Sequence, residues 1–429
     1  MKYVIVGNGV ASVGAIEGIR RVDPDGEITV ISEESSPTYG RPLISYLLAG
    51  KIGPERMQLR PVTFYDKFKV KMMLGTKVTG VDAKAKTVAT ADGHNYPYDK
   101  LLIATGGVPF IPPLSGKDGS GVYGFTTLAH AETLIDVAKN CKNVVVIGGG
   151  LIGLKAAESL HDRGVKVSIV ELAPRVLSAA FDDKAGNLVA KRLDEVGISV
   201  HCGTQATEIK RDAGGAVQGV TLKDGTFLPA QAVVIAIGVV PASSLAKDAG
   251  ITVDRGIIVD DSLASSDPDV YAAGDVAQAK DLILDENRVV PIWPNAFNQG
   301  FYAGKNMAGA ASPYSGGLAM NAIAFYGLPT VSVGVVNPAP GEQGIEVADN
   351  LDEEHGTYRK LVFKDGKLVG YVLLGEIDIA GLYTGFIRFK FPLDAETKEK
   401  LVSGRPSILQ WPEGFFDEQF NPVGAQEIV

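Results

Sequence analysis

The sequence predicts an α/β fold with two doubly wound parallel-sheet domains and a small α+β domain after them. Two glycine-rich turns, at residues 7–12 and 148–153, carry this prediction. Each turn follows an apolar run typical of a buried strand and opens a helical pattern, so each begins a βαβ unit. From about residue 315, short strand patterns with turn signals replace this texture. The length of 429 residues leaves room for three domains.

Both glycine turns have the spacing of dinucleotide-binding fingerprints. The first glycine permits a tight turn, the second lets the backbone approach a pyrophosphate, and the third position packs the helix on the strand. Glu33 and Glu171 close the two βαβ units, where an acid accepts hydrogen bonds from ribose hydroxyls. One such motif is weak evidence, but two in the same context predict two Rossmann-like domains. The expected nucleotide contacts are Gly7, Gly9, Ala11 and Ser12 in the first turn, and Gly148, Gly150, Ile152 and Gly153 in the second.

The composition and charge of the chain argue against several classes of partner and site. A net charge of −9 argues against nucleic acid or an anionic membrane surface. The longest apolar run, near residues 232–240, is too short to cross a bilayer. Because Met1 leads directly into a strand pattern, we expect no signal peptide and a cytoplasmic location. Cys141, Cys202 and the five histidines lack the spacing of a metal or redox motif, so we expect no metal site.

Three strand–glycine turns support a family resemblance. They are residues 104–106, 236–238 and 271–275, and together with the fingerprints they resemble the FAD-dependent pyridine nucleotide–disulfide oxidoreductase superfamily over nearly the whole chain. Residues 39–50, 293–300 and 303–309 are most similar to its NADH:rubredoxin reductase and nitrite-reductase flavin-module branch. The hairpin expected at residues 358–374, with a turn at 364–366, is similar to the small C-terminal domain of that branch.

The resemblance implies a glutathione-reductase-type arrangement. An FAD domain would comprise residues 1–112 and 242–314, an NAD(H) domain residues 113–241, and a C-terminal α+β domain residues 315–429. It implies that Asp275 hydrogen-bonds the ribityl-phosphate region of FAD. Glu171 favours NADH because a carboxylate repels a 2′-phosphate, whereas the nearby Arg175 leaves NADPH open. Further cofactor contacts are expected at Arg41, Pro42, Ala104, Thr105, Gly106, Gly238, Gly274, Trp293 and Ala296.

The chain departs from the family at the flavin. The position of the single redox cysteine is Pro42, so disulfide, CoA-disulfide or persulfide reduction is not expected. Relatives pair a glutamate with a lysine near the flavin, and here those positions are Lys155 and, approximately, Tyr46, our two catalytic candidates. Lys155 either places a positive charge near flavin N5, which would raise the flavin potential, or points to solvent along its helix.

The function implied is hydride transfer from NADH to FAD, with the two rings held about 3–3.5 Å apart, followed by electron transfer to an external acceptor. The acceptor would be a rubredoxin- or ferredoxin-type carrier or a partner subunit. Two alternatives stay open: a peroxide-forming NADH oxidase, and a flavoprotein subunit or NADH-responsive interaction module of a larger redox complex. The C-terminal domain of the family often supports a homodimer, and the tail from Leu409 is a candidate partner contact.

Two charged segments have competing interpretations. Residues 51–77 contain seven basic residues and two acids, a local charge of +5 that would attract an acidic carrier. Alternating exposure along an edge strand explains the same pattern, and we favour that interpretation. Residues 342–354 contain six acids and are expected to form a solvated loop.

Overall fold

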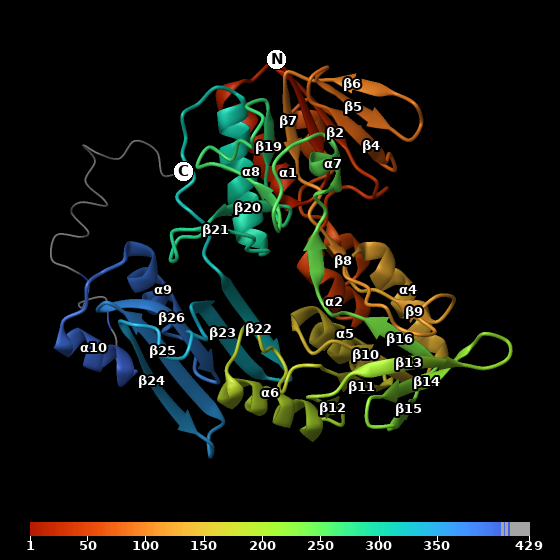
Figure 1. Cartoon of the computed structure of the whole chain (residues 1–429), viewed down its shortest axis with the longest axis vertical. Coiled ribbons are helices and arrows are strands. Elements are labelled where there is room, and N and C mark those ends of the chain that lie inside the picture. The colour runs from red at the N-terminus through yellow and green to blue at the C-terminus, as the bar shows by residue number, and fades with distance from the viewer. Residues whose placement is uncertain (405–406, 408–410, 412–429) are drawn as a thin grey trace. The chain divides into compact units, whose positions relative to one another are not determined.

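The structure, a computed structural model, describes residues 1–404, 407 and 411 (Figure 1). It separates into two compact units: Met1–Val176 with Leu193–Leu318, and Leu177–Arg192 with the described residues from Ala319 onward. The finer three-domain division stays a prediction. The tail from Leu409 lies, apart from Trp411, outside the described residues. Within the described part of the chain, no helix combines the length and apolarity that a membrane crossing requires.

The first unit contains a five-stranded parallel sheet in the order β19-β7-β1-β2-β3. Its central strands are apolar and buried, as parallel strands covered on both faces are. The strands are β1 (Lys2–Val6), β2 (Glu27–Ile31), β3 (Val70–Met73), β7 (Lys100–Ile103) and β19 (Val270–Ala272).

A second five-stranded parallel sheet of the same unit has the order β12-β11-β10-β16-β9. The unit β10–α5–β11 repeats β1–α1–β2, which confirms the two predicted βαβ units. The strands are β9 (Val122–Tyr123), β10 (Asn143–Ile147), β11 (Lys166–Val170), β12 (Ser199–His201) and β16 (Ala232–Ile235).

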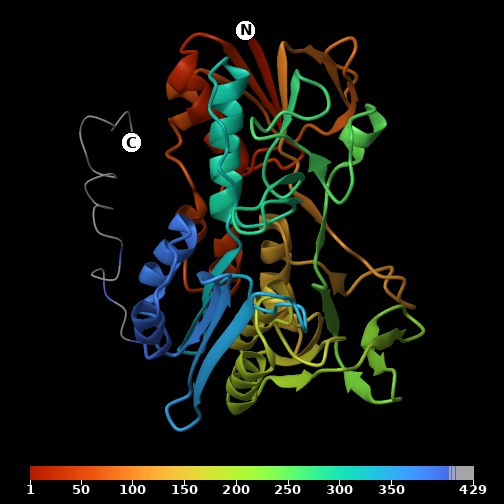
Figure 2. The same ribbon diagram turned by 60° about the vertical axis from the view of Figure 1, so that its left-hand side comes forward.

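Helices α1 (Val10–Val22) and α8 (Trp293–Met307) lie side by side (Figures 1 and 2). Their backbones touch, because a Cβ on Gly14 would lie 2.2 Å from the carbonyl oxygen of Phe297 and one on Gly300 would lie 1.9 Å from that of Ala11. This contact places the start of α8 beside the first fingerprint. The other helices wholly within this unit are α2 (Ile44–Leu48), α3 (Phe64–Lys67), α4 (Leu128–Asn140), α5 (Leu151–Asp162) and α7 (Ser244–Asp248), with 3-10 turns at Arg41–Leu43 and Pro54–Met57.

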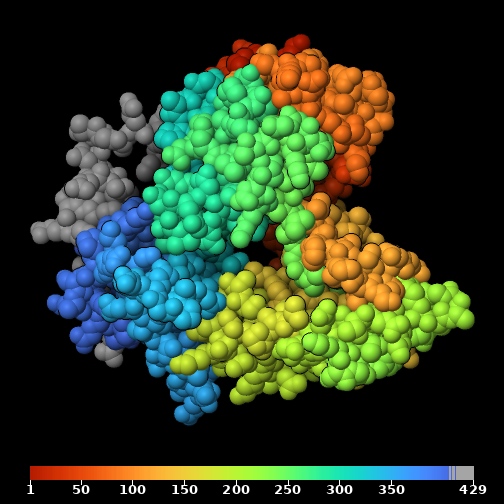
Figure 3. Space-filling model, viewed as in Figure 1, coloured from red at the N-terminus to blue at the C-terminus, as the bar shows by residue number. Residues whose placement is uncertain are grey.

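Two antiparallel meanders extend from the parallel sheets. One of them is β13–β15, which forms a yellow-green surface in Figure 3, and the other is β4–β6. A two-stranded ribbon, β8 with β17, connects the two halves that carry the parallel sheets. The strands are β4 (Val78–Asp82), β5 (Thr87–Thr90), β6 (Asn95–Pro97), β8 (Gly107–Pro109), β13 (Ala206–Arg211), β14 (Val217–Leu222), β15 (Phe227–Pro229), β17 (Val239–Pro241), β18 (Ile257–Ile258), β20 (Ala277–Lys280) and β21 (Asn287–Arg288).

The second unit is built on an antiparallel sheet in the order β22-β23-β26-β25-β24, against which α9 packs (Figure 2). The predicted hairpin is confirmed: Asp365 (φ 48°) and Gly366 (φ 74°) form its two-residue turn, and positive φ at both positions is typical of a type I′ turn. The elements are β22 (Met320–Phe325), β23 (Leu328–Gly334), β24 (Ile345–Asp352), β25 (Thr357–Lys364), β26 (Lys367–Leu374), α9 (Ala380–Phe389) and α10 (Ala395–Val402), and α6 (Asp183–Glu195) begins in this unit.

The expectation of a solvated loop at residues 342–354 was wrong, because most of the segment is the edge strand β24. Its acids are held by ion pairs: Glu346 pairs with Lys398, and Asp349 with Lys184 at 2.8 Å. These ion pairs compensate the charge that had suggested a loop.

Candidate functional site

The first fingerprint is a tight turn between β1 and α1. Gly7 has φ 108°, and a Cβ there would lie 2.2 Å from the carbonyl oxygen of Ala104, so only glycine fits. Ser12 occupies the third position of the fingerprint, and its hydroxyl donates to the carbonyl of Gly7 at 2.8 Å. Ser12 is fully buried. The turn is therefore built by contacts within the protein, as the sequence indicated.

The second glycine of this turn faces open space. Gly9 is the N-cap of α1, adopts φ −88°, and makes no side-chain cap. A Cβ there would meet nothing within 4 Å. The first backbone amides of α1 therefore lie beside open space at Gly9, and this arrangement fits a pyrophosphate.

The second fingerprint repeats this geometry. A Cβ on Gly148 (φ 116°) would lie 2.4 Å from the carbonyl oxygen of Ala236, and one on Gly153 would lie 2.0 Å from that of Gly148. Gly150, the N-cap of α5, again lacks a side-chain cap, and a Cβ there would meet nothing within 4 Å. Ile152, inside the first turn of α5, is half-buried. Both turns therefore fit a dinucleotide.

Glu171 lies against this second turn. Its carboxylate accepts hydrogen bonds from the amides of Gly149 at 2.5 Å and Ala173 at 2.7 Å. Glu33, its counterpart, is instead exposed and pairs with Lys77 at 3.3 Å. The ribose roles of both acids stay predictions.

Arg41 is the centre of a polar cluster beside the first site. It donates to Glu34 at 2.5 Å and to the carbonyl of Thr126 at 2.7 Å, while the Tyr39 hydroxyl donates to Glu34 at 2.6 Å. Burial alone would lower the pKa of Arg41, but Tyr39 and Glu34 raise it, so the guanidinium stays charged. Pro42 follows in the same 3-10 turn.

The strand–glycine turn after β19 faces the start of α8. The amide of Gly274 donates to Gln299 at 2.8 Å, and a Cβ on Gly274 would lie 3.6 Å from that of Ala296. Burial raises the pKa of Asp275, and the charge of Arg41 opposes this shift. Trp293 begins α8 and is half-buried. Asp275 and Arg41, far apart in sequence, thus influence each other electrostatically.

The other two strand–glycine turns meet at the β8–β17 ribbon. Gly106 (φ 68°) accepts from the amide of Ala242 at 2.9 Å, and Gly238 (φ 120°) accepts from that of Phe110 at 3.0 Å. The Thr105 hydroxyl donates to the carbonyl of Ala242 at 2.9 Å. The carboxyl ends of β7 and β16 are therefore connected directly, and such ends are where α/β sheets bind ligands.

Lys155 does not point to solvent. Its side chain is 17% exposed and forms an ion pair with Glu158. Its Nζ lies 5.7 Å from the centre of the Tyr46 ring on α2. The solvent alternative was wrong, but the charge beside Tyr46 is compensated by Glu158 rather than simply positive.

The basic segment at residues 51–77 is largely neutralised. Four of its cations pair with acids, which counts against a free basic docking patch: Lys51 with Asp162, Arg60 with Glu17, Lys69 with Asp25, and Lys77 with Glu33. The edge-strand alternation expected for Lys67, Lys69 and Lys71 is present only at Lys71, which lies on edge strand β3. Lys67 ends α3, and Lys69 lies in the turn between them with φ 50°.

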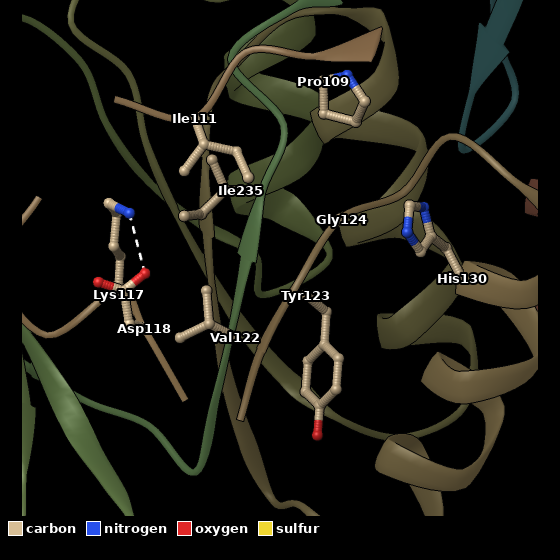
Figure 4. A pocket seen from close by; sticks show the side chains of 9 residues that line it. All are labelled: Pro109, Ile111, Lys117, Asp118, Val122, Tyr123, Gly124, His130 and Ile235. Atoms are coloured by element: carbon tan, nitrogen blue, oxygen red, sulfur yellow. Dashed lines mark hydrogen bonds and ion pairs between the residues drawn. The ribbon is translucent and has the colours of Figure 1, made fainter. Parts of the chain in front are cut away.

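A separate pocket lies beside β8 and β9 (Figure 4). Pro109, Ile111 and Tyr123 give it an apolar wall, and His130 lies at its edge. Burial lowers the pKa of His130, so the imidazole is neutral. Burial likewise raises the pKa of Cys141 and Cys202, which keeps both thiols protonated. These groups lack the activation that nucleophilic chemistry requires.

Sequence reasoning missed three residues of the first site. Glu34 holds Arg41, Gln299 holds Gly274, and Asn8 hydrogen-bonds Thr38. Asn8 lies within the fingerprint and was visible in sequence. The contacts of Glu34 and Gln299 arise from the fold.

Comparison with known proteins agrees with this geometry. Residues 1–300 match the family model described as pyridine nucleotide-disulphide oxidoreductase, and residues 320–390 match the rubredoxin NAD+ reductase C-terminal domain. The chain is 35% identical over 377 residues to a nitrite reductase [NAD(P)H] of Bacillus subtilis, covering 87% of this chain and 46% of that protein. It is 33% identical over 389 residues to the NADH-dependent phenylglyoxylate dehydrogenase subunit epsilon of Aromatoleum evansii, covering 90% and 91%.

A solved structure shows the same fold. The ferredoxin reductase for the CYP199A2 system of Rhodopseudomonas palustris superposes with a TM-score of 0.84 at 28% identity, covering 92% of this chain and 96% of that one. The chain spans about half the length of the nitrite reductase but nearly all of the other two relatives. The chain therefore belongs to the pyridine nucleotide-disulphide oxidoreductase family, whose members use FAD and NAD(P)H.

Proposed function

We propose that this chain is a flavoprotein reductase that takes electrons from NADH through FAD and delivers them to a small iron–sulfur protein or a partner subunit. The observation that carries the proposal is the pair of open glycine cradles at Gly9 and Gly150. They begin helices on two parallel sheets whose carboxyl ends are connected by the β8–β17 ribbon. Two nucleotides held in this way can exchange a hydride without leaving the protein.

The residues of the chain would bind and orient the cofactors. Bound FAD would supply a ring that takes up a hydride and releases electrons to an acceptor. The amides of α1 and the Arg41 guanidinium would hold its phosphates, and Asp275 its ribityl hydroxyls. The amides of α5 and Glu171 would hold NADH.

Pro42 bears on how electrons would leave the flavin. The family resemblance implies that Pro42 occupies the position where some members carry a redox cysteine, so no thiol there would accept electrons from the flavin. Electrons would therefore pass directly to an external acceptor. The similarity to the rubredoxin reductase C-terminal domain and to a ferredoxin reductase supports a small carrier. The near full-length similarity to a dehydrogenase subunit supports the partner-subunit form.

Anaerobic stopped-flow spectroscopy tests the acceptor. The NADH-reduced protein is mixed with rubredoxin, ferredoxin or oxygen, and flavin absorbance is followed. Fast reoxidation by one carrier and slow reoxidation by oxygen supports the reductase. Fast reoxidation by oxygen with stoichiometric peroxide would identify an oxidase instead. Slow reoxidation by all three points to a partner subunit.

The proposal extends to assembly and location. We expect a homodimer through the C-terminal unit, as the family resemblance implies, and a cytoplasmic location, where NADH is supplied. Light scattering that gives a monomer mass would contradict the first expectation. Fractionation with an extracytoplasmic marker would contradict the second.

A further inference from the structure

Helix α2 belongs to the half whose sheet contains β1, but its end is bonded to a residue of the other half. The Arg163 guanidinium, which follows α5, donates to the carbonyls of Leu48 and, at 3.3 Å, of Leu47. The last carbonyls of a helix lack partners in its own ladder, so groups from outside the helix satisfy them. Here that group comes from α5, the helix that begins at the second fingerprint.

Further contacts join the same two helices. The Ser159 hydroxyl, one turn before Arg163, lies 2.9 Å from the carbonyl oxygen of Ser45. Both serines are buried, so water does not compete for this contact. Lys51, just after α2, pairs with Asp162 at 2.7 Å. The C-terminal part of α5 is therefore attached along α2 and the residues that follow it.

The chain that leads into α2 is bonded to the second half as well. The Tyr39 hydroxyl accepts from the amide of Leu128 at 3.0 Å, and Arg41 donates to the carbonyl of Thr126 at 2.7 Å. Both partners lie where α4 begins, and α4 packs against α2 as α5 does (Figure 1). Residues 39–51 are therefore attached to the second half at both of their ends.

These contacts restrain a movement that the β8–β17 ribbon alone would permit. Halves joined by a narrow connection rotate relative to each other unless a second contact restrains them. Hydride transfer needs the two rings about 3–3.5 Å apart, and a misplacement of about 1 Å costs about a hundredfold in rate. Residues 39–51 include Arg41, expected at the FAD phosphates, and are bonded to the helix that begins at the Gly150 cradle.

We propose that residues 39–51 form a strut that fixes the angle between the two halves, and that Arg163 is a positioning residue for hydride transfer. Arg163 lies at the end of α5 opposite to the Gly150 cradle, so it acts through the two helices rather than on a cofactor. The inference rests on the FAD and NADH assignments of the proposed function and deepens that function.

Two measurements on the same variants test the strut. Hydrogen exchange of the apoprotein at the amides of residues 49–51, which are bonded to the carbonyls of residues 45–47, reports whether the end of α2 is held. Anaerobic stopped-flow spectroscopy of the FAD-loaded protein gives the flavin reduction rate at saturating NADH and the NADH concentration at half the maximal rate.

The variants are Arg163→Met, which removes the donors, and Arg163→Lys, which keeps one charged donor. Arg211→Met is the matched control. Arg211 also donates to backbone carbonyls, those of Gly116 at 2.9 Å and Gly215 at 2.7 Å, but these lie in its own half. The melting temperature of each apoprotein is the folding readout.

We expect Arg163→Met to raise the exchange rate of these amides about tenfold, the change that corresponds to one lost hydrogen bond. The reduction rate at saturating NADH should fall about tenfold. The NADH concentration at half the maximal rate and the FAD content should stay within about twofold of wild type. Arg163→Lys should lie between Arg163→Met and wild type, and Arg211→Met should match wild type.

A saturating reduction rate within about twofold of wild type in Arg163→Met would overturn the inference and leave the proposed function standing. A slower rate without faster exchange at residues 49–51 would also overturn it, because the effect would not pass through α2. If Arg163→Met does not fold, the same criteria apply to Arg163→Lys. A wild-type holoprotein that NADH does not reduce would overturn the proposed function, and the role of Arg163 with it.

Discussion

The Lys155 ammonium is ion-paired with the Glu158 carboxylate one turn further along α5, and both side chains are largely buried, 17% and 8% exposed. The pair packs toward α2, since Lys155 Nζ lies over the Tyr46 ring and Ser159 donates to the carbonyl of Ser45 at 2.9 Å. This interface joins the helix of the second fingerprint to the segment that follows Arg41. The expected hydride-transfer site therefore carries an anion, Glu158, beside the cation of Lys155.

Removing either charge of the Lys155–Glu158 pair should shift the flavin midpoint potential, and the two shifts should have opposite signs. Lys155→Met removes the positive member and should lower the midpoint potential by about 30 mV, whereas Glu158→Gln should raise it by a similar amount. The double variant should return close to wild type. Spectroelectrochemistry measures the three values, and shifts of the same sign would contradict the pairing argument.

Substitutions at Gly150 and Gly148 should separate an effect on NADH binding from an effect on folding. A Cβ at Gly150 meets nothing within 4 Å, so Gly150→Ala should leave the melting temperature unchanged and raise the NADH dissociation constant about tenfold or more. At Gly148 a Cβ would lie 2.4 Å from a carbonyl oxygen at φ 116°, so Gly148→Ala should lower the melting temperature. Wild-type NADH affinity in Gly150→Ala would show that the cradle does not bind the dinucleotide.

Glu171 should set the preference between NADH and NADPH. Its carboxylate is held beside the turn by two backbone amides, where it would repel a 2′-phosphate. Glu171→Ala should raise the ratio of kcat/KM for NADPH to that for NADH about tenfold. An unchanged ratio from steady-state kinetics would remove Glu171 from the ribose site.

Asp275 predicts a pH dependence of the apoprotein. Its pKa is raised by burial, so the folded state binds its proton more tightly than the unfolded chain does. Stability is therefore lost as pH rises from the ordinary value of 3.8 through the raised pKa. Asp275→Asn removes this loss, and should raise the apoprotein melting temperature at pH 8 but have little effect near pH 4. If Asp275→Asn changed the melting temperature equally at both pH values, the result would contradict a raised pKa of Asp275.

Much of the fold was predictable from residue patterns. The two fingerprints, the buried strands before them and the hairpin at Asp365 are local signals, and each is present in the structure. Residues 342–354 were misassigned because acids usually indicate a loop, whereas in β24 Asp349 is paired with Lys184 of α6 and Glu346 with Lys398 of α10. Such pairs join distant parts of the chain and leave no local signal.

The same limit applies to the site. Arg41 pairs with Glu34 and not with the neighbouring Glu33. The chain turns after β2, and this turn brings the side chains of Tyr39 and Arg41 to the Glu34 carboxylate. Adjacent glutamates are equivalent in sequence, and only the turn distinguishes them. Lys155 likewise gave two alternatives from sequence, and its pairing with Glu158 required the helix geometry and the packing against α2.

The central claim is that the chain holds FAD and NADH in its two cradles and passes a hydride between them. Anaerobic titration of the purified holoprotein with NADH, followed by flavin absorbance, tests it most directly. The account predicts complete bleaching by about one equivalent of NADH per FAD, and for Gly150→Ala bleaching by dithionite but a much weakened response to NADH. A holoprotein without flavin, or one that dithionite bleaches and NADH does not, would contradict it.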